Sequence, residues 1–269
     1  MAVGRLPHRD PNQPALVFVP GDFGDGDTAW GELIARIGPR ARTLVVERPE
    51  IDDPGRHFSF AGDAATVIQA IESWTTGRVH LVGHSYGGLV AIAAAAARPD
   101  LLHSLHLIEP PLFALVPEDA TAQAMNQEAR RIQSRYDRSG GEASTEAFFT
   151  MIGAERAVER LRGTAEWEHL TRHAARFARS EPAGDFPLAT LDRVPHDVRI
   201  AIYRGGRSHP ALREIAAALA ARLPGARLHE FPDANHAVQR AGEPFVARLL
   251  DEAAGAASRR SPAADAARE

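Results

Sequence analysis

One serine stands where the surrounding residues could turn it into a nucleophile. Residues 83–87 read Gly-His-Ser-Tyr-Gly, with Ser85 at the centre, between an apolar run at 79–82 and an alanine-rich helical segment at 88–97. A sharp strand-to-helix turn strains its central residue and lifts that side chain clear of the sheet, and small residues on either side let the strand and helix approach. The pattern therefore predicts an exposed hydroxyl at Ser85, beside the free N–H groups of a helix start.

A serine hydroxyl needs a general base, and position must select one among the 12 histidines of the chain. His236 follows the predicted strand 227–231 and precedes the last predicted helix, which places it at the same carboxyl edge of the sheet as Ser85. His169 and His173 have a helical spacing that could suit a metal. No third ligand is evident near them, so a solvated helix face is the better interpretation and no metal site is predicted.

These motifs resemble the α/β-hydrolase fold family over about residues 14–252. The features that carry the resemblance are the Pro-Gly-Asp-Phe-Gly-Asp-Gly turn at 20–26, the elbow at 83–87 and the Asn-His pair at 235–236. The resemblance implies a chain order of nucleophile, acid and histidine, with His236 as the base. It also implies an eight-stranded template, but the short segment before the first strand leaves room for about six.

The commonest family position for the orienting carboxylate is empty in this chain. It follows the predicted strand 198–203, where residues 203–210 include neither Asp nor Glu and Ser208 stands about where the acid is expected. Taken literally, the triad lacks a member at this position.

The other family solution puts the acid after the strand that follows the nucleophile, as in haloalkane dehalogenases and some lipases. Glu109 stands there, 109 − 85 = 24 residues beyond Ser85. A carboxylate at the end of an apolar strand needs a partner, and Pro110 should hold its backbone extended. We predict Glu109 as the acid. The alternatives are a carboxylate that only marks the strand end or pairs with an arginine, and Asp233, which is too close in sequence to His236 to reach its far nitrogen easily.

A tetrahedral intermediate needs two N–H donors. The backbone of Tyr86 is the first candidate, and the resemblance places the second at Asp22, with Phe23 next in line. The Asp22 carboxylate should point away from the oxyanion, because a negative charge beside it would oppose charge development. A plain glycine turn is the alternative interpretation of this loop.

Alternating strand and helix signals at both ends of the chain predict an α/β fold, a mostly parallel sheet of about six strands with helices on both faces. Residues 14–110 and 193–254 are expected to form this α/β-hydrolase core, and residues 111–192, where strand signals stop, an inserted helical cap over the site. Residues 255–269 lose periodicity and are expected to be a disordered tail. Aromatic residues in and near the cap are candidates for an apolar substrate pocket: Phe23, Phe113, Phe148, Phe149 and Trp167.

Composition excludes much other chemistry. All 31 basic residues are arginines and the chain has no cysteine, so a Schiff-base lysine, a P-loop lysine, a thiol nucleophile and a thiolate metal site are excluded. The formal net charge is −4 with no basic face, which argues against nucleic-acid binding. The N-terminal residues contain no apolar signal-peptide core, and no apolar run could span a membrane. A soluble, cytoplasmic protein is expected, with no membrane partner and an oligomeric state that the sequence leaves open.

Together these features predict a cofactor-free serine hydrolase of a small carboxylic ester or thioester, acting through a Ser85 acyl-enzyme. Cofactor-free haloperoxidase or C–C bond hydrolase chemistry on the same fold is an alternative. A non-catalytic small-molecule-binding member is another, motivated by Ser208. Serine at position 85 argues against the dehalogenase and epoxide-hydrolase branches, which use aspartate.

Overall fold

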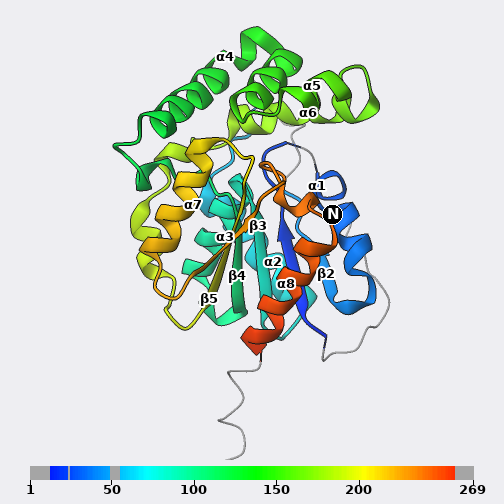
Figure 1. The fold of residues 1–269 in the computed structure, drawn as a ribbon, viewed down its shortest axis with the longest axis vertical. Helices are drawn as coiled ribbons and strands as arrows, with labels where there is room; N and C mark the ends of the chain where they lie inside the picture. The colour runs from blue at the N-terminus through cyan, green and yellow to red at the C-terminus, as the bar shows by residue number, and fades with distance from the viewer. Residues whose placement is uncertain (1–12, 24, 49–54, 258–269) are drawn as a thin grey trace, which may run out of the picture.

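A parallel sheet forms the centre of the molecule. The computed structural model describes residues 13–23, 25–48 and 55–257. Within them, six strands pair in the order β2-β1-β3-β4-β5-β6, and every pairing is parallel (Figure 1). Their bounds are β1 Ala15–Val19, β2 Arg42–Val45, β3 Val79–His84, β4 Leu102–Ile108, β5 Arg199–Gly205 and β6 Arg227–Phe231. The predicted fold class and the reduced number of strands are confirmed.

Helices cover both faces of the sheet because side chains along each strand alternate between two cores. Leu16 and Phe18 of β1 pack in the core beneath α1 (Gly26–Ile37) and α8 (Glu243–Ala257). Val17 and Val19 pack in the opposite core. The helices on that side are α2 Phe60–Trp74, α3 Tyr86–Ala97 and α7 Pro210–Arg222.

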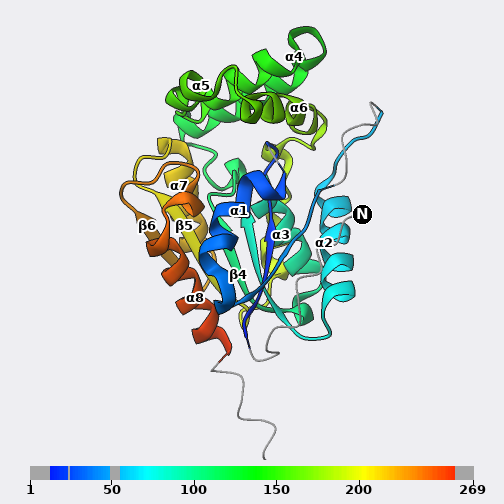
Figure 2. The same cartoon turned by 90° about the vertical axis from the view of Figure 1, so that its right-hand side faces the viewer.

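A layer of three helices lies over one end of the sheet, where the strands have their carboxyl ends (Figures 1 and 2). It consists of α4 Ala120–Met151, α5 Glu155–Leu161 and α6 Ala165–Arg179, inserted between β4 and β5. Gly140 interrupts α4, because its φ of 76° and ψ of 178° are not helical and two helical segments meet there at a kink. Glycine tolerates this conformation without strain.

Side chains and short turns mark where the longer elements begin and end. Ser59 and Thr164 accept N–H groups of the first turns of α2 and α6, which satisfies donors that have no partner within the helix. Short 3₁₀ turns occur at Gly38–Arg40, Pro99–Leu101, Phe113–Leu115, Ala183–Asp185, Leu188–Arg193 and Val238–Arg240. Helix α8 continues to Ala257, past residue 255 where a tail was expected, and residues 258–269 lie outside the described residues. In the described part of the chain, no helix combines the length and the apolar character needed to cross a membrane.

A chain of buried hydrogen bonds crosses the middle of the sheet. The Ser104 hydroxyl lies 2.7 Å from Nδ1 of His80 and 2.7 Å from Nε2 of His106. Nδ1 of His106 lies 2.8 Å from the Tyr203 hydroxyl. Burial lowers the pKa of His80 to about 3, and the pKa of His106 also falls well below its usual value because the ring is buried. Both imidazoles are therefore neutral in the folded protein at neutral pH.

These buried neutral histidines predict that the folded protein loses stability at acidic pH. The folded-state pKa values are lowered, so unfolding takes up protons, and the stability from the neutral rings is complete above about pH 6.5. It is lost as the pH falls from about 6.5 toward the folded value, at about 1.4 kcal/mol per pH unit per histidine. Urea unfolding between pH 7 and pH 5 measures the slope, and His80→Gln should remove about one histidine's share. An unchanged slope in that variant would contradict this account.

Candidate active site

Close backbone packing fixes the turn that carries Ser85. A methyl group on Gly83 would lie 2.4 Å from the carbonyl oxygen of Gly87, and one on Gly87 would lie 2.4 Å from the carbonyl oxygens of Val19 and Pro20. No side chain fits in either gap, so the turn requires glycine at both positions.

Ser85 itself adopts a strained backbone conformation, with φ 53° and ψ −127°. Its N–H donates to the carbonyl oxygen of Ile108 at 2.9 Å, and its own carbonyl accepts the N–H of Gly88 at 2.8 Å. These two hydrogen bonds hold a residue that lies in a sparsely populated region, which is the conformation expected of a nucleophile presented at a strand-to-helix turn.

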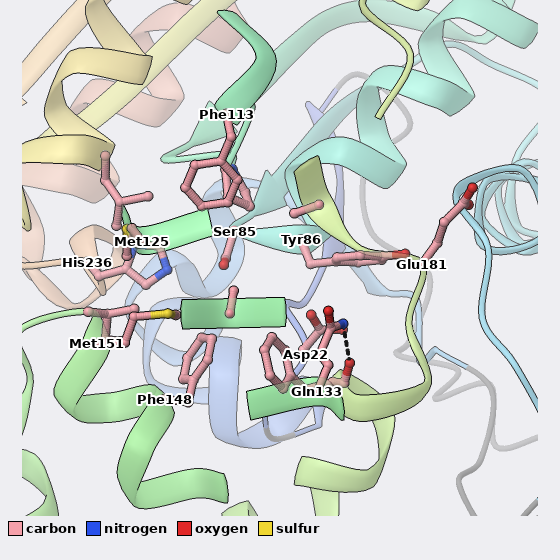
Figure 3. Close-up of a pocket in the computed structure, with 16 residues that line it drawn as sticks. Asp22, Ser85, Tyr86, Phe113, Met125, Gln133, Phe148, Met151, Glu181 and His236 are labelled. Carbon is pink, nitrogen blue, oxygen red and sulfur yellow. Dashed lines mark hydrogen bonds between the residues drawn. The ribbon is translucent and has the colours of Figure 1, made fainter. Parts of the chain in front are cut away.

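A buried acid–base pair lies at the same edge of the sheet. Glu109 has no exposed surface, and its Oε2 lies 2.8 Å from Nδ1 of His236. Its Oε1 accepts the backbone N–H of Gly205 at 2.7 Å. Since an ionised carboxylate only accepts hydrogen bonds, Nδ1 carries the proton and Nε2 is left free to act as a base. Figure 3 shows a ring nitrogen of His236 directed toward the Ser85 hydroxyl.

The backbone of Glu109 differs from the expected extended form. Its φ is +43°, so the expectation that Pro110 keeps it extended is wrong. The Glu109 N–H donates to the carbonyl oxygen of Tyr203 at 3.2 Å, and the two carboxylate contacts fix the side chain. Tertiary hydrogen bonds thus hold the residue in a conformation that local preference disfavours.

Among the described residues, the other two candidate positions for the acid form no hydrogen bond or ion pair with His236. Ser208 is buried beside Gly205, and its hydroxyl has no hydrogen-bond partner among the described residues. Asp233 is exposed and pairs with Arg207 at 2.5 Å. The end of β5 therefore supplies a backbone donor to Glu109 rather than a carboxylate to His236.

His84, the residue before Ser85 in the turn, contacts His236 directly. Its Nε2 donates to the backbone oxygen of His236 at 2.9 Å, and the two rings are 4.7 Å apart. Burial and the neighbouring His236 lower the pKa of His84 to about 3, so it stays neutral and adds no charge beside the base. The pattern of the turn contains no signal for this role, because the contact spans 152 residues.

The two predicted donor residues both line the pocket that contains Ser85 and His236 (Figure 3). Tyr86 is the first residue of α3, where the backbone N–H groups have no partner within the helix. The Asp22 carboxylate is buried and accepts hydrogen bonds from Arg48 and Ser180.

The pocket is apolar and small. The space inside it that water can reach is about 40 Å³, and its remaining lining comes mostly from the helical layer. Phe113 and Phe148 line the pocket. Trp167 is buried in a separate hydrophobic cluster, and Phe23 and Phe149 pack against that cluster. Several other residues that line the pocket belong to no sequence motif and were not predicted: Met125, Ala129, Gln133, Met151, Ile152, Phe177, Glu181, Ala183 and Leu212.

The histidine pair of α6 is half-buried beside the start of α1. The His169 and His173 rings are 4.4 Å apart, and His169 Nε2 lies 3.2 Å from the Asp25 carboxylate. In the parts of the chain that the structure describes, no cluster of His, Asp or Glu has a geometry that could hold a metal ion.

The chain is similar to known proteins in both sequence and structure. A family model described as "Alpha/beta hydrolase family" matches residues 16–248. A pyrrolizixenacetamide deacetylase of Xenorhabdus hominickii is 33% identical over 105 residues, 37% of this chain and 38% of that protein. The human serine hydrolase BPHL is 29% identical over 98 residues, 34% of each. The chain thus spans little more than a third of the curated relatives that it matches. The structure of MenH from S. aureus superimposes with a TM-score of 0.72 at 14% identity, over 93% of this chain and 97% of that one.

The role of the hydrogen bond from His84 to the His236 backbone can be tested by mutation of His84. His84→Phe removes the hydrogen bond that holds the His236 backbone, and the loss of about 1 kcal/mol should slow the reaction of Ser85 with a fluorophosphonate by about fivefold. His84→Gln keeps an N–H donor and should retain more of the rate. His229→Gln, a change outside the pocket, is the control. Equal rates in wild type and His84→Phe would contradict the role.

Proposed function

Because the chain belongs to the alpha/beta hydrolase family, we propose that it is a serine hydrolase that cleaves small carboxylic esters or thioesters through an acyl-enzyme on Ser85. The observation that carries the proposal is the buried pair of Glu109 and His236, joined at 2.8 Å, whose His236 lines the same pocket as the strained Ser85. Nucleophile, base and acid come from three distant segments, and a chance meeting at one sheet edge would be unexpected.

The reaction proceeds in two steps. His236 Nε2 takes the hydroxyl proton as Ser85 Oγ attacks the substrate carbonyl carbon, and the backbone N–H groups of Tyr86 and Asp22 hold the oxyanion. The intermediate collapses, the bond to the leaving group breaks, and His236 returns the proton to the departing oxygen or sulfur. Water then attacks the acyl carbon while His236 takes its proton, the bond from that carbon to Ser85 Oγ breaks, and His236 returns the proton to Ser85 Oγ as the acid product leaves. Glu109 stays ionised throughout and stabilises the imidazolium.

The pocket supports a short acyl group. Its lining is mostly apolar and includes Phe113, Met125 and Met151. Among the described residues that line it there is no arginine to bind an acidic acyl chain, and the carboxylates of Asp22 and Glu181 would repel one. The free space of about 40 Å³ suits a few heavy atoms rather than a long chain. The name of the Xenorhabdus relative, a deacetylase, agrees with a small acyl group.

The nucleophile is tested by labelling and by substrate length. A fluorophosphonate should label the wild type and leave Ser85→Ala unlabelled, because only the activated serine reacts. Among p-nitrophenyl esters, kcat/KM should be highest for acetate and butyrate and should fall at least tenfold for octanoate, since the pocket is short. The hypothesis fails if the wild type is not labelled or if Ser85→Ala is labelled equally.

The acid is tested by a matched pair of amide substitutions. Glu109→Gln keeps an acceptor for the Gly205 N–H but removes the charge that orients and stabilises protonated His236. It should lower kcat by about 10³ to 10⁴-fold with the fold intact. Asp233→Asn changes an exposed carboxylate and should alter kcat by less than about twofold. The reverse ranking would assign the role to Asp233.

A further inference from the structure

One buried arginine lies between the two residues that carry the proposed oxyanion donors. Arg48 follows β2 and is 3% exposed. Its Nη1 donates to Asp22 Oδ1 at 2.5 Å, and its guanidinium carbon lies 4.5 Å from the centroid of the Tyr86 ring. The same planar group therefore contacts Asp22 by an ion pair and Tyr86 by a cation–π interaction.

The other edges of this guanidinium are occupied as well. Its Nε and Nη2 lie 2.9 Å and 2.8 Å from Asp63 Oδ2 on α2, and Nη2 also donates to the Ser180 hydroxyl at 3.0 Å. These groups are buried, and a buried ion pair of this kind persists only when its polar atoms are matched. The arginine therefore cannot move without disturbing four segments of the chain at once.

The contact with Asp22 has an electrostatic consequence for the reaction. A bare carboxylate in the wall of the Ser85 pocket would oppose the negative charge that develops on the substrate oxygen. Arg48 pairs with this carboxylate as well as with Asp63, and Arg176 adds a second positive charge that acts on Asp22. The Ser180 hydroxyl donates a further hydrogen bond to the same Asp22 oxygen at 2.9 Å. These contacts hold the Asp22 side chain and offset its charge.

Ser180 connects this arrangement to the helical layer. It directly follows α6, and it forms an isolated parallel bridge with Phe58, next to the start of α2. The contacts of Ser180 with Arg48 and Asp22 span 132 and 158 residues. The surroundings of Asp22 are therefore completed by a residue from the end of the inserted helices.

We propose that Arg48 is a positioning residue for the oxyanion hole, which holds Asp22 and Tyr86 in the geometry that binds the transition state, and that Ser180 makes this arrangement depend on the helical layer. The inference rests on the proposed function. Because the oxyanion forms in the tetrahedral intermediate and its transition states but not in the bound substrate, loss of the arginine should lower kcat and leave KM nearly unchanged. Removing an oxyanion donor outright costs about 10² to 10³-fold in kcat, which sets the upper limit.

Three variants test the role with a small ester and with ethylboronic acid, which adds to Ser85 as a tetrahedral anion. Arg48→Lys keeps the charge but loses the planar fork, so it cannot contact both partners, and kcat should fall about 10 to 100-fold. Ser180→Ala should lower kcat about threefold to tenfold. In each case KM should change by less than about threefold, and boronic acid affinity should fall by the same factor as kcat.

A double-mutant cycle adds a readout that a general loss of stability would not reproduce. Asp22→Asn removes the charge that Arg48 neutralises and keeps the backbone N–H. If Arg48 acts through Asp22, the double variant should lose much less kcat than the product of the two single losses. Glu252→Gln is the matched control, because Glu252 is buried and bridges Arg199 and Arg227 far from the pocket. It should lower Tm and leave kcat unchanged.

Each outcome decides one of the two hypotheses. If the wild type is active but Arg48→Lys raises KM at constant kcat, or loses no more kcat than Glu252→Gln, the positioning role is wrong. Multiplicative losses in the cycle would also overturn it. A wild type that hydrolyses no ester and binds no boronic acid would instead overturn the proposed function, and the role of Arg48 with it.

Discussion

The packing of three backbone segments at the turn after β3 is the constraint on which the site depends. Gly83 and Gly87 let the strand, the following helix and the end of β1 approach to distances that exclude any side chain. This contact strains Ser85, aims its hydroxyl into the pocket and brings the turn after β1 beside the start of α3. Every other functional group is positioned relative to that point, so rigidity here is a precondition for the chemistry.

The proposed acid, Glu109, shows that the carboxylate beside His236 can come from either of two neighbouring strands. The ends of β4 and β5 lie side by side, and either could carry the carboxylate that orients His236. In this protein Glu109 after β4 lies 2.8 Å from His236, and Gly205 at the end of β5 donates a backbone N–H to the same carboxylate.

Several buried polar groups adjoin the proposed site and are hydrogen-bonded there. Glu109 is paired with His236, and Asp22 with Arg48 and Ser180. His84 stays neutral through burial. Other buried polar groups lie within the sheet, such as Ser104 between His80 and His106. Polar groups are costly to bury unless they are hydrogen-bonded, so the contacts at the sheet edge stabilise the side chains that they hold.

Local hydrophobic periodicity in the sequence is enough to predict the alternation of strands and helices and the parallel sheet. The reduced number of strands follows from the short segment before the first strand. The sequence also identified Ser85, His236 and Glu109 as candidates, because each sits at a recognisable strand end. Only the tertiary structure decided which side chains meet. The contacts of His84 with His236, of Arg48 with Asp22 and Tyr86, and the positive φ of Glu109 depend on segments far apart in sequence. Local sequence patterns do not predict such contacts, because the contacts form only when the strands and the helical layer pack together.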